Sequence, residues 1–219
     1  DFIRGSLRAT LRKRGVVIGV SGGVDSAAVL ALAVRAVGAQ KVVALLLPDK
    51  DSEPDSERLG RLACAAFGVA SVFLEDITPA LEGFGCYRRR DAAIKASLPE
   101  YDPSAGYKCK LVLPPDLLEA DTLNLFHITV VRPDGTEVTQ PLGPREFLEI
   151  VAASNFKQRA RMSFLYYHAE CRNFAVLGTA NRNEHGQGFF VKHGDGGVDL
   201  SPILHLYKTQ VYQLAEYLG

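Results

Sequence analysis

Residues 16–30, VVIGVSGGVDSAAVL, narrow the possible folds more than any other part of the sequence. An apolar run of strand length ends near two glycines, and an alanine- and valine-rich helical pattern begins directly after them. A strand that meets a helix through a glycine-rich turn is typical of parallel sheets, in which ligands lie at the carboxyl ends of the strands. The stretch therefore predicts a sheet edge that holds an anion.

Three further apolar runs repeat the strand pattern, at residues 42–47, 71–74 and 174–177. Segments of helical length and spacing separate the first three runs, which indicates βαβ units and a parallel sheet covered on both faces. The chain has 219 residues, of which 47% are hydrophobic, and this suffices for one sizeable core. We expect a single α/β domain over residues 1–219, with a Rossmann-like, three-layer α/β/α arrangement around a central parallel sheet.

The pattern changes between the apolar runs at residues 71–74 and 174–177. Several prolines occur within residues 99–115, and two segments of alternating apolar and polar residues flank Asp134 and Gly135, a strong hairpin signal. We therefore expect an insertion at about residues 86–145 that carries a β-hairpin. Helical spacing resumes afterwards, and on that helix we expect Cys171 to be a small, buried apolar group.

Charge and cysteine usage exclude several function classes. The chain has 25 basic and 25 acidic side chains, so its balance does not indicate a nucleic-acid or membrane surface. No apolar run approaches the roughly 20 residues that span a bilayer. The four cysteines lie more than twenty residues apart and form no CxxC pair. We expect a reduced, cytoplasmic protein that binds neither nucleic acid nor membrane.

The SGGVDS motif combines groups that suit a phosphate. Gly22 and Gly23 can take positive φ and let backbone N–H groups approach an anion, while the following helix directs the positive end of its dipole there. Ser21 and Ser26 add hydroxyls. Asp25 would repel a phosphate unless a divalent cation lies between them, which favours a magnesium-bound pyrophosphate. The alternative is a plain glycine turn in which Asp25 only complements the helix dipole.

The motif resembles the loop of the N-type ATP pyrophosphatases. Residues 154–219 resemble the NAD synthetases, both ammonia-dependent and glutamine-dependent, because NFKQRARM, GTANRNE, FVKHGDGG and KTQV occur in that family's order and spacing. With residues 15–80 the resemblance covers most of the chain outside the insertion. It implies an adenine nucleotide α-hydrolase-like fold and a ligase that converts deamido-NAD, ATP and ammonia into NAD, AMP and pyrophosphate.

The same resemblance implies which residues form the site. The ATP-binding residues would be Gly19, Val20, Ser21, Gly22, Gly23, Val24, Asp25, Ser26, Thr179 and Lys208. Magnesium would be held by Asp25 and Glu184, which with Lys208 make the catalytic set. The residues that would hold deamido-NAD are Arg159, Lys192, Asp195 and Asp199.

Each of these residues also has an ordinary structural interpretation. Arg159 and Lys192 are alternatively solvated surface cations, and Glu184 is alternatively an exposed carboxylate. Asp195, next to two glycines, alternatively shapes a turn. The motif context favours the functional interpretation in each case.

Alternative functions stay open. The insertion favours an amide ligase for another carboxylate, and a non-catalytic nucleotide-binding homologue is the second alternative. A tRNA-modifying pyrophosphatase is disfavoured, since such enzymes usually need a catalytic cysteine pair or a basic RNA-binding face. By the resemblance we expect a homodimer, with ammonia that arrives free or from a separate glutaminase chain.

Overall fold

The computed structural model describes residues 1–112 and 126–219, which form two compact units. The first unit combines Asp1–Ala80 with Lys157–Gly219, and the second comprises Leu81–Phe156. Each unit has a hydrophobic core of its own. Whether they act as a single domain stays a prediction.

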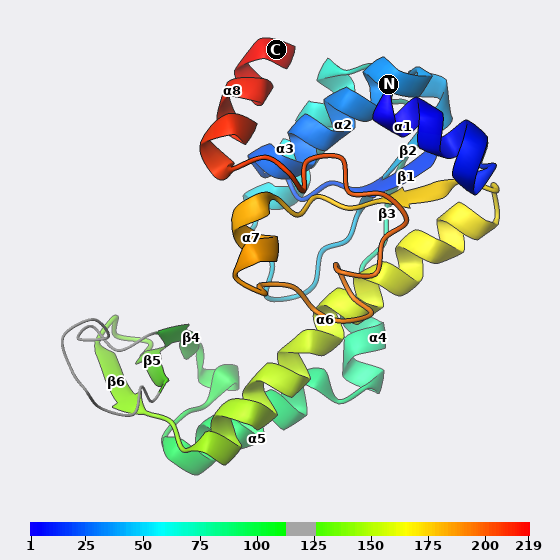
Figure 1. The fold of residues 1–219 in the computed structure, drawn as a ribbon. Coiled ribbons are helices and arrows are strands. Elements are labelled where there is room, and N and C mark those ends of the chain that lie inside the picture. The colour runs from blue at the N-terminus through cyan, green and yellow to red at the C-terminus, as the bar shows by residue number, and fades with distance from the viewer. Residues whose placement is uncertain (113–125) are drawn as a thin grey trace. The chain divides into compact units, whose positions relative to one another are not determined.

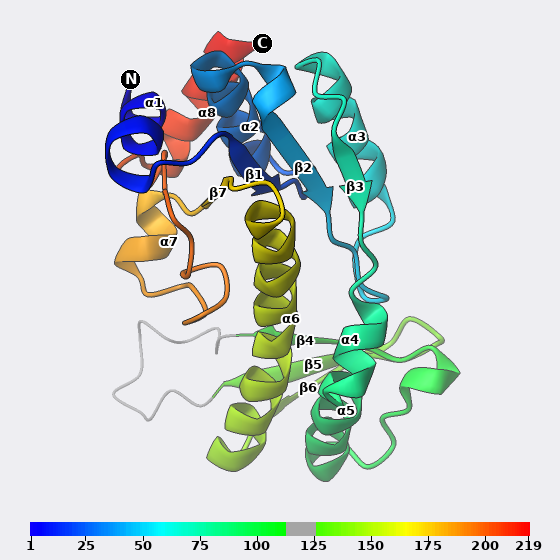
Figure 2. The same cartoon turned by 90° about the vertical axis from the view of Figure 1, so that its right-hand side faces the viewer.

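A four-stranded sheet forms the centre of the first unit. Its strands are β1 (Val16–Gly19), β2 (Val42–Leu46), β3 (Val72–Leu74) and β7 (Ala175–Leu177), in the spatial order β3-β2-β1-β7 (Figures 1 and 2). All three pairings are parallel, and Val16 lies opposite both Val42 and Ala175. The predicted parallel sheet is confirmed, with strands that lie within the predicted runs.

Apolar side chains cover both faces of this sheet because successive residues of a strand point to opposite sides. On one face, Val16 and Ile18 pack in a core with the helices α1 and α2. On the other face, Val17 and Val43 pack against residues of the long helix α6. The expected three-layer α/β/α arrangement is confirmed.

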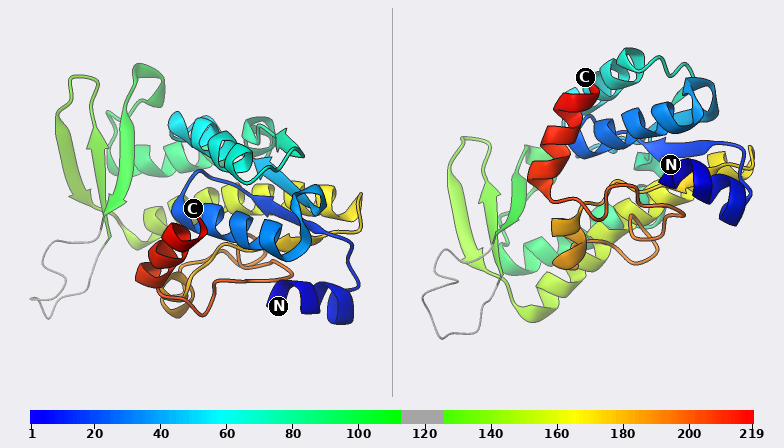
Figure 3. Two further views of the ribbon diagram at one scale, coloured as in Figure 1. Left: turned by 90° about the horizontal axis from the view of Figure 1, so that it is seen from above. Right: turned by 45° about the horizontal axis from the view of Figure 1, so that its top comes forward.

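The helices that the first unit contains follow from the apolar spacing between the strands. They are α1 (Phe2–Gly5), α2 (Val24–Val37), α3 (Asp55–Ala66), α7 (Arg182–Gly186), α8 (Lys208–Leu218), the π-helix Ser6–Leu11, the 3₁₀ turn Ala39–Lys41 and the second half of α6 (Pro144–Glu170). Figure 3 shows α2 and α8 side by side, where Val211 is buried in the shared core. This contact brings the beginning of α8 to the loop that precedes α2.

The second unit contains an antiparallel sheet of three strands. They are β4 (Lys108–Val112), β5 (His127–Val131) and β6 (Glu137–Pro141), in the order β4-β5-β6. The turn between β5 and β6 confirms the predicted hairpin, because Gly135 has φ of +85° and Asp134 accepts a hydrogen bond from the Thr136 N–H at 2.9 Å. β4 was not predicted, since its sequence KCKLV alternates charged and apolar residues only weakly.

Helices complete the second unit, and its core is separate from that of the first. These elements are α4 (Thr78–Gly83), which begins in the first unit, α5 (Cys86–Ser97), the 3₁₀ turn Pro103–Ala105 and the first half of α6. Ile94, Tyr101, Ile128 and Leu142 are buried together. The predicted insertion falls within this unit, apart from residues 113–125, which lie outside the described residues.

The burial expected for Cys171 is wrong. Helix α6 ends at Glu170, so Cys171 lies in the turn beyond it, where its side chain is exposed. All four cysteines lie among the described residues, and no disulfide joins any two of them. Among residues 1–112 and 126–219, no helix is both long and apolar enough to cross a membrane.

Candidate functional site

The loop between β1 and α2 depends on one glycine with an unusual backbone conformation. Gly22 has φ of +81°, and a Cβ at this position would lie 2.7 Å from the Leu59 Cβ and 3.0 Å from the Ser56 carbonyl oxygen. Gly23 takes φ of −83° and forms the N-cap of α2 without a side-chain cap. The loop is therefore packed closely against α3, while the first N–H groups of α2 have no side-chain partner at the cap.

Serine hydroxyls hold the same loop together from within. Ser26 is buried, and its Oγ donates to the Gly23 carbonyl at 2.8 Å while it accepts from the Ser21 N–H at 3.3 Å. Ser21 is exposed, and its Oγ accepts from the Gly23 N–H at 3.3 Å. Ser26 thus shapes the loop, and Ser21 is the hydroxyl that faces outward.

Asp25, in the first turn of α2, has a partner at each carboxylate oxygen. The Lys208 ammonium, at the beginning of α8, contacts Oδ2, and the Asn181 amide donates to Oδ1 at 3.2 Å. The Asp25 side chain is 19% exposed, so these charged groups interact with little screening by water. The fold therefore brings together two of the three predicted catalytic residues, from positions 183 residues apart.

Glu184, the third predicted catalytic residue, joins the same group through Asn181. A capping box begins α7: the Asn181 Oδ1 accepts from the N–H groups of Asn183 and Glu184 at 3.0 and 3.2 Å, and the Glu184 carboxylate accepts from the Asn181 N–H at 3.1 Å. Asn181 is only 2% exposed. One buried residue thus contacts both carboxylates that were predicted to hold magnesium, Asp25 through its side-chain amide and Glu184 through its backbone N–H.

These residues fit a magnesium ion. In nucleotide sites Mg²⁺ is bound through one or two carboxylates together with substrate phosphates and water. Asp25 and Glu184 would supply oxygen ligands from two different helices, and both contact Asn181. The Lys208 ammonium, which contacts one Asp25 oxygen, would compete with the ion for that carboxylate.

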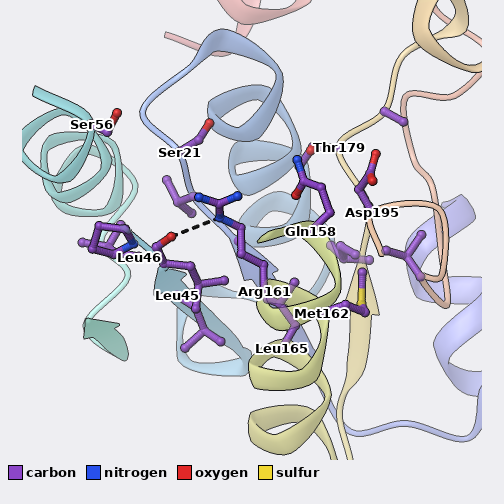
Figure 4. Close-up of a pocket in the computed structure, with 18 of the residues that line it drawn as sticks. Ser21, Leu45, Leu46, Ser56, Gln158, Arg161, Met162, Leu165, Thr179 and Asp195 are labelled. Carbon is purple, nitrogen blue, oxygen red and sulfur yellow. Dashed lines mark hydrogen bonds between the residues drawn. The ribbon is translucent and has the colours of Figure 1, made fainter. Parts of the chain in front are cut away.

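A cavity of about 420 Å³ opens at the carboxyl ends of β1, β2 and β7. Figure 4 shows side chains from α3, α6 and these strand ends that surround it, including Ser21, Ser56, Arg161 and Thr179. Six predicted site residues line this cavity: Gly19, Val20, Ser21, Thr179, Glu184 and Asp195. The glycine loop comprises residues 19–26. Its residues 22–26 do not line the cavity, and neither does Lys208.

The residues predicted to hold the dinucleotide lie around the segment that follows α7. The Arg159 Nε donates to the Lys192 carbonyl oxygen at 3.2 Å, and the Lys192 side chain is exposed. The Asp195 carboxylate accepts from the Val191 N–H at 2.9 Å, as a turn-shaping residue would, and it also lines the cavity. Their roles in substrate binding stay predictions.

Asp199 differs from these three because the protein engages both of its carboxylate oxygens. One accepts from the Val176 N–H at 2.8 Å and the other from the Tyr166 hydroxyl at 3.1 Å. Burial, together with the charge of Asp199, raises the pKa of Tyr166 to about 12, and the hydroxyl also donates to the Gly197 carbonyl at 2.9 Å. Asp199 thereby ties the segment after α7 to β7 and α6.

Three residues of this region were not predicted as site residues from the sequence: Asn181, Arg161 and Asp49. Asp49 comes just after β2, at the sheet edge where ligands bind, and that position was an available signal. Asn181 and Arg161 lie within the motifs GTANRNE and NFKQRARM, and Asn181 stands three residues before Glu184 as in a capping box, but their contacts with Asp25 and Asp49 join residues distant in sequence.

The parallel sheet and the glycine loop at its carboxyl edge define a nucleotide-binding α/β protein. The sequence model of the NAD synthase family matches residues 1–95 and 127–219. The chain belongs to the NAD synthase family. The predicted resemblance is thus confirmed, and with it, at the level of the family, the prediction of an ATP-using ligase of NAD synthesis.

Curated relatives agree with this assignment. The chain is 52% identical over 219 residues to the NH₃-dependent NAD(+) synthetase of Mesorhizobium japonicum, covering 100% of this chain and 67% of that protein. It is 41% identical over 206 residues to the synthetase of the same description from Thermotoga maritima, covering 94% and 66%. It spans 65% and 64% of the synthetases from Rhizobium meliloti and Rhizobium rhizogenes, about two thirds of their length.

Solved structures with the same fold include two of different description. The NH₃-dependent NAD synthetase from Campylobacter jejuni, in complex with the nitrate ion, has a TM-score of 0.65 at 28% identity and covers 100% of this chain and 69% of its own. The NMN synthetase from Francisella tularensis has a TM-score of 0.66 at 25% identity and covers 99% and 66%. The fold is therefore that of this family, as predicted.

Proposed function

We propose that this chain carries the ATP-binding, amide-forming part of an NAD synthetase. The nicotinate carboxylate of deamido-NAD is adenylated by ATP and then aminated by ammonia, which gives NAD, AMP and pyrophosphate. The observation that carries the proposal is the cluster of Asp25, Lys208 and Glu184 around Asn181. The curated NH₃-dependent NAD(+) synthetases that match the whole chain support the same reaction.

The charged residues divide the work on ATP. Backbone N–H groups at the beginning of α2 hold the phosphates, together with Ser21. Lys208 shifts from Asp25 to the oxygens of the leaving phosphate. Its ammonium can do so because it is a compact charge on a flexible side chain. Asp25 and Glu184 hold Mg²⁺, which supplies charge neutralisation at the phosphates.

The residues proposed to bind deamido-NAD orient its nicotinate carboxylate for two successive displacement reactions. In the first, a nicotinate carboxylate oxygen attacks the α-phosphorus and the bond to the β-phosphate oxygen breaks, which releases pyrophosphate. In the second, the ammonia nitrogen attacks the acyl carbon, AMP leaves with the electron pair, and solvent takes the proton. Arg159 and Lys192 supply the positive charge that binds the substrate's phosphates or carboxylate.

A second candidate keeps this chemistry and changes the acceptor. The likeness to the Francisella tularensis NMN synthetase favours a nicotinate mononucleotide as the alternative carboxylate.

The proposal extends to partners and location. A homodimer is expected by likeness to the family, with ammonia taken from solution or from a glutaminase on a separate chain. Four cysteines that form no disulfide fit a reducing, cytoplasmic environment.

A variant at Asp25 tests the proposed chemistry. Pyrophosphate release from Mg-ATP, ammonium and deamido-NAD should fall by on the order of 100-fold or more in Asp25→Asn, by analogy with the loss of a group that stabilises transition-state charge. Asp55→Asn is the matched control, because the Asp55 side chain on α3 is 71% exposed and pairs with the similarly exposed surface residue Arg58 at 3.0 Å. An Asp25→Asn protein with unchanged release would contradict the catalytic role, and ATP binding without any release by the unsubstituted chain would favour a non-catalytic homologue.

A further inference from the structure

Arg161 is the one basic side chain among the described residues that line the cavity. It extends from α6 to the end of β2, where its Nε donates to the Leu47 carbonyl oxygen at 3.1 Å, the dashed line in Figure 4. Its Nη2 donates to Asp49 Oδ2 at 2.8 Å. The Nε–Nη2 edge of the guanidinium is thus occupied, and these two bonds fix its plane.

Asp49 is held even more firmly than Arg161. Its side chain is only 2% exposed, and the Lys157 ammonium contacts its Oδ1 at 3.1 Å and Asp51 at 2.7 Å. The Asp51 N–H also donates to Asp49 Oδ1 at 2.8 Å. A buried carboxylate needs such partners, because an unpaired charge in the interior is strongly unfavourable. Arg161 and Lys157 thus pair with Asp49 and Asp51, and Asp49 supplies a buried negative charge directly beside the guanidinium.

This charge balance argues against a phosphate as the group that Arg161 binds. Its positive charge is already compensated by Asp49, and the Nε–Nη2 edge, one of the edges that grip a phosphate with two parallel hydrogen bonds, is in use. Residues 22–25 of the glycine loop, where phosphates would sit, lie outside the cavity lining. What remains is a fixed, flat guanidinium face bordered by the apolar side chains of Leu46 and Met162.

We propose that Arg161 binds the adenine ring of ATP with its guanidinium face and its remaining N–H groups, and that Asp49 and Lys157 are positioning residues that fix its plane. Arginine stacks on aromatic rings, and a guanidinium whose conformation is already fixed loses less entropy when a ring binds. The proposal rests on the proposed use of ATP and adds the group that recognises the base.

Binding of adenosine, AMP and ATP to the full chain, measured by calorimetry without acceptor or ammonia, separates the base from the phosphates. In Arg161→Gln and Arg161→Lys, the dissociation constants of all three ligands should rise by a similar factor, on the order of 5- to 30-fold for a lost contact of this kind. A factor that grows with the number of phosphates would overturn the proposal in favour of a phosphate contact. Unchanged constants would exclude any contact.

Asp49→Asn tests the positioning role through the difference between adenosine binding and ATP binding, which a general structural defect would not change. Without the compensating carboxylate, Arg161 gains net charge and loses its fixed plane, so adenosine binding should weaken more than ATP binding. An equal loss for both ligands would contradict the positioning role. Arg58→Gln is the matched control, because the Arg58 side chain on α3 is 64% exposed, and it should bind all three ligands as the unsubstituted chain does. The binding measurements contain no acceptor, so their result does not depend on turnover. A chain that binds ATP but forms no NAD in a separate assay would refute the proposed function without affecting this test.

Discussion

The Asn181 amide donates to Asp25 at 3.2 Å while its carbonyl oxygen caps the helix that carries Glu184. A single buried side chain therefore fixes the separation of two carboxylates that belong to α2 and α7. Groups that hold a cation must keep their positions while their charges repel each other, and a neutral amide with donors and an acceptor suits that task.

Replacement of Asn181 by alanine should reduce both stability and turnover. The change removes a helix cap and leaves buried partners unpaired, which predicts a loss of about 1–3 kcal/mol in the free energy of unfolding. Pyrophosphate release should fall further than stability alone explains, because Asp25 loses the amide that links it to the beginning of the helix that carries Glu184. Denaturant unfolding and a pyrophosphate assay measure the two effects. Gln187→Ala, at the exposed end of α7, is the control, and equal activities of the two variants would contradict the bridging role.

The two loop glycines should respond differently to alanine. Gly22→Ala puts a Cβ 2.7 Å from Leu59 in a left-handed conformation, which costs about 1–2 kcal/mol before any clash is counted. In Gly23→Ala the new Cβ would lie 3.4 Å from the Ser21 Oγ at φ of −83°, which the loop can accept with little adjustment. ATP binding should therefore weaken much more in Gly22→Ala than in Gly23→Ala, as titration calorimetry would measure. The reverse order would mean that the loop has another conformation in the complex.

Loss of the Lys208 charge should affect metal binding and turnover in opposite directions. In Lys208→Gln, Asp25 no longer has a cationic partner, so Mn²⁺, used as a paramagnetic substitute for Mg²⁺, should bind more tightly in the absence of nucleotide. Pyrophosphate release should fall by about 100-fold, because the phosphates lose a cation. Electron paramagnetic resonance measures the free Mn²⁺. Weaker Mn²⁺ binding in the variant would show that Lys208 does not compete with the metal for Asp25.

The Tyr166 hydroxyl should make stability depend on alkaline pH. Burial and the nearby Asp199 raise its pKa in the folded chain to about 12, whereas the unfolded value is about 10. The stabilisation is therefore complete below about pH 10 and is lost as pH rises towards 12, because the unfolded chain releases the proton first. In Tyr166→Phe, the free energy of unfolding should fall less steeply over this window. Parallel curves from denaturant titrations at pH 8 to 11.5 would contradict the assignment.

The sheet could be predicted from sequence because its signal is local. Buried parallel strands are short, nearly uniform apolar runs, and β1 and β2 are buried at almost every residue. The glycine turn and the Asp134–Gly135 hairpin are likewise each indicated by two adjacent residues. β4 was not predicted, because its strand conformation depends on pairing with β5 and not on a local sequence pattern.

The site could be predicted only as far as its motif residues. The pair Asp25 and Lys208 followed from the family resemblance, while the contacts of Asn181 with Asp25 and of Arg161 with Asp49 join residues 156 and 112 positions apart. Such partners are set by packing of α6 and α7 on the sheet, which no local pattern encodes. Cys171 was misassigned because helical spacing was extended beyond the true end of α6 at Glu170, through residues 171–173.

The most direct test of the account is the product formed from each acceptor. Purified chain is given Mg-ATP, ammonium and either deamido-NAD or nicotinate mononucleotide, with pyrophosphate, AMP and the amide product measured by mass spectrometry. The account predicts pyrophosphate and AMP release that depends on deamido-NAD, with NAD formed in equal amount. Release that depends only on the mononucleotide would contradict the assigned acceptor, and no amide product from either would contradict the proposed reaction of this chain.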